Sequence, residues 1–114
     1  MKPIVLDAMG GDNAPSVVVE GAREAQSFGI PVELVGDPDR IANSDGIRVH
    51  SALEVIEMDD EPGRAVRTKK DSSIVRAAEC VRDGHASAMV SAGNTGAVAA
   101  AALLRMKRLK GVNR

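Results

Sequence analysis

The apolar positions of this chain fall into short runs of strand length, separated by longer stretches with the spacing of helices. The short runs have the length and composition of buried strands, and they are residues 4–7, 32–36, 47–50 and 86–90. The longer stretches carry apolar residues at helical spacing, and they are residues 17–28, 74–81 and 97–104. Strands that alternate with helices form βαβ units. The pattern therefore predicts an α/β fold, a parallel-sheet βαβ sandwich with helices covering both faces.

Turn residues mark the ends of these elements. Pro15 suits the first turn of the first helix, Gly29 ends that helix and Pro31 prevents it from resuming. The second helix is expected to stop near Gly84, and its start can be capped by Asp71, Ser72 or Ser73. A parallel sheet would normally continue with another strand after the last helix. We therefore expect residues 1–114 to form a single N-terminal α/β segment of a longer domain.

The middle of the chain is less regular. Residues 53–58 are predicted to be either a continuing strand or a helical turn. An acidic break at 59–63 and a strongly basic turn at 64–70 follow. The last predicted helix, at 97–104, is apolar nearly all round, so we expect it to be buried, or packed on another subunit or on a further part of the domain.

The first candidate for chemistry is the turn Ser91-Ala92-Gly93-Asn94-Thr95-Gly96-Ala97, which joins the last predicted strand to the last predicted helix. Such a turn directs free backbone N–H groups and the positive end of a helix dipole at one point, which suits a phosphate or a carboxylate. The glycines allow close approach of a ligand, and Asn94 or Thr95 can cap the helix. The turn is neither a Walker A loop nor a GxGxxG motif. It predicts either an anion site or a glycine-rich cap that serves only the fold.

A second glycine loop follows the first predicted strand, where Gly10 and Gly11 lie between Asp7 and Asp12. In parallel sheets, ligands bind beyond the carboxyl ends of the strands, and both glycine loops are predicted at such ends. An acid at a strand end can position a substrate, hold a cation or act as a base. The commoner role of such acids is to accept hydrogen bonds from loop amides and helix N-termini. The sequence leaves both roles open.

A third candidate is a cluster of cations ahead of a predicted helix start, formed by Arg64, Arg67, Lys69 and Lys70 followed by Ser72 and Ser73. Cations beside a helix N-terminus can hold a phosphorylated group or an acidic protein partner. A solvated basic turn that balances the acids at 59–61 is the simpler interpretation. The serines are not predicted nucleophiles, because nothing ties His50 or His85 to either of them.

Composition and charge exclude several classes of function. The 114 residues, 44% apolar and 27% charged, are ordinary for one small globular domain. A formal charge of −1 and a single aromatic residue argue against nucleic-acid binding, which uses basic surfaces and base-stacking rings. The lone Cys80 and two isolated histidines provide no metal-ligand spacing, so no metal site is predicted. Packing explains Cys80 better than reactivity does.

The cysteine count and the distribution of apolar residues also bear on the cellular location of the protein. A single cysteine is consistent with the reducing cytoplasm. Asp7 interrupts the N-terminus where a signal peptide would still be apolar. The longest apolar run, residues 97–104, is far short of the roughly 20 residues that span a bilayer.

Four segments resemble, in the right order, the signatures of the bacterial phosphate acyltransferases called PlsX. They are LDAMGGDNAP at 6–15, VIEMDDEP at 55–62, KKDSS at 69–73 and VSAGNTGA at 90–97. Each motif alone is weak, but four motifs in register over the whole chain are a specific match. The resemblance implies transfer of a fatty acyl group from acyl-acyl-carrier protein to inorganic phosphate, which gives acyl phosphate for phospholipid biosynthesis.

The resemblance also implies an architecture and a setting. The expected fold is Rossmann-like, similar to those of phosphate acetyltransferases and isocitrate dehydrogenases, and the expected assembly is a homodimer. The family's enzymes are cytoplasmic, need no organic cofactor, and associate peripherally with the membrane. Their partners are acyl-acyl-carrier protein and inorganic phosphate, and a basic segment such as 64–70 could meet the acidic carrier protein.

The resemblance finally implies roles for named residues. Catalytic roles are expected for Asp7, Asp12, Lys69 and Asn94. Phosphate or substrate contacts are expected from Gly10, Gly11, Ser72, Ser73, Ser91, Gly93, Asn94, Thr95 and Gly96. Phosphate is a competent nucleophile once it is positioned, and the tetrahedral oxyanion of acyl transfer can be stabilised by backbone N–H groups or by a cation such as Lys69.

Two other interpretations stay open. Phosphate acetyl- and butyryltransferases, which use acyl-coenzyme A, share the phosphate chemistry. The second interpretation is a non-catalytic truncated module that folds or dimerises without turnover, because family members are much longer than this chain. In the longer proteins the further residues are expected to complete the sheet, the acyl pocket, the dimer interface and the membrane-facing helices.

Overall fold

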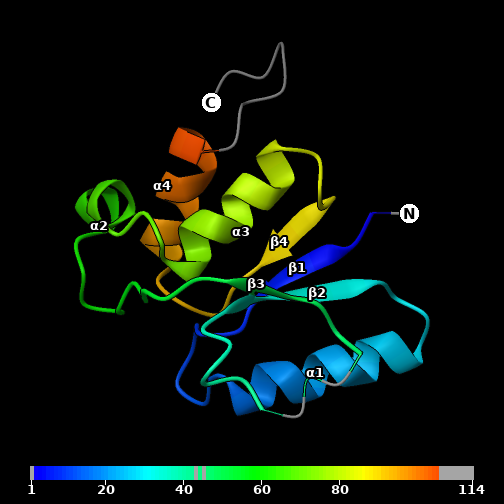
Figure 1. Cartoon of the computed structure of the whole chain (residues 1–114). Helices are drawn as coiled ribbons and strands as arrows, with labels where there is room; N and C mark the ends of the chain where they lie inside the picture. Colours follow the sequence, from blue (N-terminus) through cyan, green and yellow to red (C-terminus); the bar gives the residue numbers. More distant parts are fainter. Residues whose placement is uncertain (1, 43, 45, 106–114) are drawn as a thin grey trace.

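A parallel four-stranded sheet with helices on both faces is the architecture seen in the computed structural model, which describes residues 2–42, 44 and 46–105 (Figure 1). The strands are β1 (Ile4–Asp7), β2 (Val32–Gly36), β3 (Val49–Ser51) and β4 (Ala88–Val90), in the order β3-β2-β1-β4. The helices are α1 (Ser16–Ser27), α2 (Pro62–Thr68), α3 (Ser73–Arg82) and α4 (Thr95–Arg105). The predicted α/β parallel-sheet sandwich is confirmed.

Each face of the sheet packs against a different set of helices. Helix α1 lies on one face, and α2, α3 and α4 lie on the other (Figure 1). Alternate side chains of a strand point to opposite faces. In β1, Val5 belongs to the cluster on the α3 side, whereas Leu6 packs with the cluster on the α1 side. A further cluster joins α2, α3 and α4 around Val66, Ile74 and Ala101.

Local sequence signals account for most helix ends. Helix α3 begins after Ser72, whose hydroxyl oxygen accepts a hydrogen bond from the Val75 N–H at 3.2 Å, as its predicted capping role requires. Helix α1 is followed by Gly29, which takes a left-handed φ of 82°. Pro15, expected in the first turn of this helix, instead directly precedes it as the N-cap residue.

The prediction of a basic turn at 64–70 is wrong, because most of these residues lie in helix α2. The acids read as a break supply the cap: the Glu61 carboxylate accepts a hydrogen bond from the Arg64 N–H at 2.6 Å. Pro62 then fits the first helical position, where its missing N–H costs nothing. Only Ala65 and Val66 are buried, so the apolar period is too short to reveal the helix.

Other boundaries also differ from the sequence pattern. Residues 53–58 are neither strand nor helical turn, and Glu54 forms only an isolated parallel bridge with Ser72. Strands β3 and β4 each begin two residues later than predicted.

Helix α4 is less buried than its composition suggests. Its small residues Ala97 and Ala101 are buried, while Leu103 and Leu104 remain 55% and 53% exposed. None of the described helices is both long enough and apolar enough to cross a membrane.

Candidate functional site

Two glycine loops meet at the carboxyl ends of the neighbouring strands β1 and β4. After β1 the chain turns to α1 on one face of the sheet, and after β4 it turns to α4 on the opposite face (Figure 1). Chains that leave adjacent strands in opposite directions open a crevice at a topological switch point, where α/β proteins bind ligands. Both glycine loops therefore lie where the fold places a binding site.

A hydrogen-bond network ties the two loops together. The Asp7 side chain is 2% exposed, and one of its oxygens accepts a hydrogen bond from the Met9 N–H at 2.9 Å. Its other oxygen accepts from the Ser91 hydroxyl at 2.7 Å. The Ser91 oxygen in turn accepts from the Gly93 N–H at 3.1 Å. Asp7 and Ser91 thus set the relative position of the loops.

The two loops are in backbone contact at Gly10. A Cβ atom added at Gly10 would lie 2.7 Å from the Asp7 Oδ2 and 2.8 Å from the Gly93 nitrogen. No ordinary side chain fits such distances, so this close approach requires glycine. Gly11, the next residue, has a left-handed φ of 97°. The structure therefore brings Asp7, Gly10, Ser91 and Gly93 into one cluster.

The start of α4 supplies hydrogen-bond donors beside this cluster. The Asn94 Oδ1 accepts a hydrogen bond from the Ala97 N–H at 3.1 Å and so caps the helix. The N–H groups of Thr95 and Gly96, the first two helical residues, have no acceptor within an α-helix. Both residues are exposed, and they follow Gly93 by two and three positions along the chain.

The Asn94 amide group also contacts a distant loop. Asn94 is 6% exposed. Its Nδ2 approaches the carbonyl oxygens of Glu57 at 3.0 Å, Asp60 at 3.1 Å and Met58 at 3.4 Å. The direct catalytic and phosphate-binding roles expected for Asn94 stay predictions, and this geometry gives its amide four protein partners.

Lys69 also contacts this loop. Its ammonium group donates to the Val55 carbonyl at 3.0 Å and to the Asp60 Oδ2 at 2.7 Å. The hydrogen bond to Asp60 raises the pKa of Lys69, and the same bond, with the Glu57 N–H, lowers the pKa of Asp60. Both groups are therefore charged at neutral pH. The catalytic role expected for Lys69 stays a prediction.

The remaining predicted site residues lie around this centre. Ser72 and Ser73 are buried at the start of α3, and the next residue, Ile74, has its Cδ1 3.6 Å from a Cβ added at Gly93. The side chain of Asp12 is exposed, and among the described residues it takes no part in the Asp7–Ser91 network.

Sequence reasoning missed Asp60, which joins Lys69 to the 57–60 backbone. Its place in the VIEMDDEP motif was the available signal.

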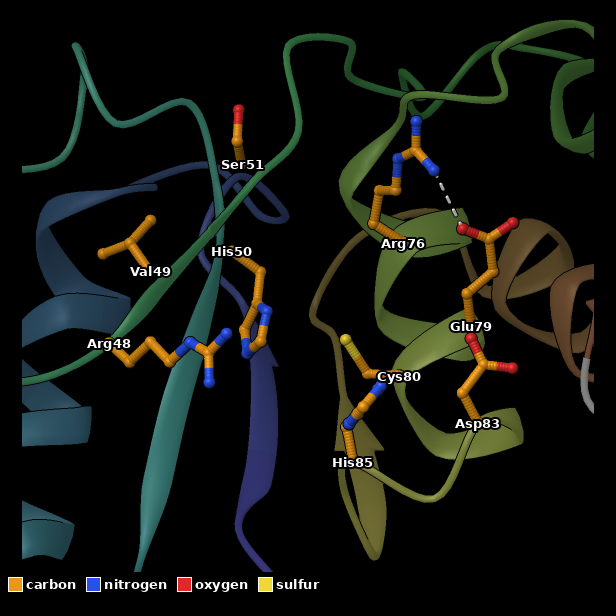
Figure 2. A pocket seen from close by; sticks show the side chains of 9 residues that line it. All are labelled: Arg48, Val49, His50, Ser51, Arg76, Glu79, Cys80, Asp83 and His85. Carbon is orange, nitrogen blue, oxygen red and sulfur yellow. Dashed lines mark hydrogen bonds and ion pairs between the residues drawn. The ribbon is translucent and has the colours of Figure 1, made fainter.

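A separate groove of about 440 Å³ lies between β3 and α3, away from the glycine loops (Figure 2). Two basic side chains of its lining contact acids: the His50 Nε2 is 2.6 Å from the Glu33 carboxylate, and the Arg76 guanidinium is 3.1 Å from that of Glu79. Burial raises the pKa of the Cys80 thiol in its wall, which keeps the thiol neutral and weakly nucleophilic at pH 7. No group of three or more potential metal ligands occurs in the described part of the chain.

Comparisons with known proteins cover the whole chain. Residues 2–114 match the family described as fatty acid synthesis protein. A phosphate acyltransferase of Desulfitobacterium hafniense strain Y51 is 50% identical over 122 residues, which cover 100% of this chain and 36% of that protein. One from Limosilactobacillus reuteri strain DSM 20016 is 49% identical, over 97% of this chain and 34% of that protein. The chain thus spans about a third of the length of the curated relatives it matches.

Proposed function

This chain belongs to the fatty acid synthesis protein family, and we propose that it is the N-terminal α/β segment of an enzyme that transfers a fatty acyl group to inorganic phosphate. The proposed donor is acyl-acyl-carrier protein, and the product is acyl phosphate for phospholipid biosynthesis. The names of the curated relatives, phosphate acyltransferase, support acyl transfer and phosphate. The four signature motifs support the carrier-protein donor.

The observation that carries this proposal is the junction of two glycine loops at the switch point of a parallel sheet. Gly10 approaches Gly93 too closely for any side chain, and α4 begins at Thr95, two residues after Gly93. An anion placed there meets several backbone donors and the positive end of a helix dipole. We assign the phosphate cradle to Gly10, Gly11, Gly93, Thr95 and Gly96, with the Thr95 hydroxyl as a further donor.

The proposed reaction needs no protein nucleophile. An oxygen of the held phosphate attacks the thioester carbonyl, the resulting tetrahedral oxyanion collapses, and the carrier thiolate leaves and takes up a proton. Orientation of phosphate supplies much of the rate, because it converts an encounter into an intramolecular step. Backbone donors at the cradle would stabilise the oxyanion. Asp7 and Ser91 keep the loops in place. The exposed side chain of Asp12 is proposed as a wall of the site, and the buried Ser72 and Ser73 as supports beneath it.

The exposed face of α2 suits an acidic partner. Arg64 and Arg67 are exposed on this helix, and Lys70 is exposed just after it. We propose that the carrier protein docks there, since complementary charge steers association. The full-length enzyme is proposed to be a cytoplasmic homodimer that associates peripherally with the membrane and needs no organic cofactor.

Trapping of acyl phosphate with hydroxylamine tests the reaction. The full chain that the gene encodes and residues 1–114 are each supplied with phosphate and either acyl-acyl-carrier protein or acyl-coenzyme A. We expect product from the full chain with the carrier-protein donor. Product formed only with the acyl-coenzyme A donor would instead favour an acetyl- or butyryltransferase. Folded protein that forms no product with either donor would contradict acyl transfer.

A further inference from the structure

We propose that Asn94 is a positioning residue that clamps the loop of residues 55–60 onto the start of α4 and thereby holds the 91–96 turn in its binding geometry. This inference rests on the proposed phosphate site. It gives Asn94 a role that the phosphate-binding motif alone does not suggest. The role is to act on the ligand through the backbone and not by contact with it.

The side-chain amide of Asn94 is fully occupied by protein partners. Asn94 has one carbonyl oxygen and two N–H donors. The oxygen accepts from the Ala97 N–H at 3.1 Å, and the nitrogen lies between 3.0 and 3.4 Å from three carbonyls of the 55–60 loop. With the residue 6% exposed, its polar atoms are turned toward protein. A phosphate contact would require the amide to give up partners that it already has.

Other residues anchor the same loop. Lys69 donates to the Val55 carbonyl and to the Asp60 carboxylate, and the same Asp60 oxygen accepts from the Glu57 N–H at 2.8 Å. Ile56, 4% exposed, packs in the same apolar cluster as Ala97 and Ala101 of α4. The loop is therefore fixed at three places: by Lys69 after α2, by Ile56 in the core, and by Asn94.

The position of Asn94 in the chain transmits this anchoring to the cradle. It lies between Gly93, which touches Gly10, and Thr95, which begins α4. Neither glycine of the 91–96 turn has a side chain to hold its own backbone in place. When the amide is bonded to the loop, the peptide groups on either side of Asn94 have one orientation. When it is lost, the N–H groups of the cradle are free to shift, and displacements near 1 Å can cost about 100-fold in rate.

The variant Asn94→Ser separates clamping from capping. Serine is a good N-cap but is too short to reach the 57–60 carbonyls. In the full chain we expect the KM for phosphate to rise about tenfold or more, while the KM for the acyl donor changes less than about twofold. Hydrogen exchange of the 57–60 amides should accelerate about tenfold. Asn94→Ala, which also loses the cap, should lower Tm further.

Asp60→Asn weakens the same loop through a different contact, because it removes the ion pair with Lys69 and leaves the 91–96 turn unchanged. If Asn94 acts through the loop, its effect on phosphate KM and that of Asp60→Asn will not add in the double variant. Arg82→Gln is the matched control: its ion pair with Asp83 lies at the far end of α3, and it should change neither readout.

Three results would overturn the inference. An unchanged KM for phosphate in Asn94→Ser would show that Asn94 has no role in phosphate binding. A raised KM with unchanged hydrogen exchange of the 57–60 amides would indicate that Asn94 contacts phosphate directly. Additive effects with Asp60→Asn would uncouple it from the loop. A wild-type chain that forms no acyl phosphate would instead contradict the proposed function, and in that case the exchange measurement still decides whether the clamp exists.

Discussion

At the scale of single residues, the candidate site is held by contacts between positions far apart in sequence. Asp7 was predicted to be either a functional acid or an acceptor for loop amides, and its hydrogen bond from the Met9 N–H is of the second kind. Its bond from Ser91 could not be predicted from sequence, because nothing local indicates that residues 84 positions apart will meet. The glycines were recognisable, whereas the close contact between Gly10 and Gly93 was not.

Gly10→Ala should disrupt this contact. The new methyl group would lie 2.8 Å from the Gly93 backbone nitrogen, which no rotamer change can relieve. Such overpacking costs about 1–3 kcal/mol, and we expect urea unfolding to show a loss of that size together with weaker phosphate binding. Wild-type stability in this variant would mean that the loops do not touch.

Ser91→Ala removes the donor to a buried carboxylate. The Asp7 Oδ2 would lose its 2.7 Å hydrogen bond, and an unsatisfied buried acceptor costs about 1–3 kcal/mol. Chemical denaturation should reveal this loss. The exposed Ser87, whose hydroxyl contacts are long at 3.4 Å, is the control, and Ser87→Ala should be close to neutral. Equal effects of the two substitutions would contradict the importance of the Asp7–Ser91 bond.

At the scale of elements, strands and long helices were predictable and the short, contact-defined segments were not. β2 was predicted with its observed limits, Val32–Gly36, because a β-branched run lies between clear turn residues. Helix α2 was not predicted, because charged residues surround its two buried positions and hide the helical spacing. The 55–60 loop shows no strand-like or helix-like spacing of apolar residues. Its conformation depends on hydrogen bonds from Lys69 and Asn94, which lie elsewhere in the sequence.

Gly96→Ala tests how α4 packs against α2. Replacing a glycine inside a helix with alanine normally stabilises by about 1 kcal/mol. Here the added Cβ would lie 2.6 Å from the Pro62 Cγ, so we expect thermal unfolding to occur at a lower temperature. Gly21→Ala in α1, where an added Cβ has no neighbour within 4 Å, should raise Tm instead. A higher Tm for both variants would show that the two helices can move apart at little cost.

At the scale of the whole molecule, the fold class followed from the alternation of strands and helices, but the strand order did not. Sequence shows where strands lie, whereas the order β3-β2-β1-β4 depends on which crossovers pack best. The place of the glycine loops at strand ends was correctly predicted. Their meeting across β1 and β4 became visible only with that order.

Acid should destabilise the whole molecule through its ion-paired carboxylates. Lys69, Arg76 and Arg82 lower the pKa values of Asp60, Asp71 and Asp83 respectively below the ordinary 3.8. Carboxyls with a lowered folded-state pKa stabilise the fold above the unfolded-state value and lose that contribution as pH falls through the folded-state value. Urea midpoints should therefore drop below about pH 4.

Asp60→Asn provides the specific check on this pH dependence. The variant should be less stable than wild type at pH 7, because it lacks the charge that pairs with Lys69. The difference should close in acid, where wild-type Asp60 is itself protonated. A difference that is constant from pH 2 to pH 7 would contradict the role of this ion pair.

The central place of β1 has a consequence for synthesis of the chain on the ribosome. Of the four described strands β1 emerges first, and it can pair with β2 early, but its other edge stays unpaired until Ala88–Val90 has been made. Until then Asp7 has no Ser91 to meet, and Gly10 has no second loop to touch. The candidate site is thus among the last parts of this segment to form, and a nascent chain that stalls before residue 88 presents an open strand edge to chaperones and to other chains.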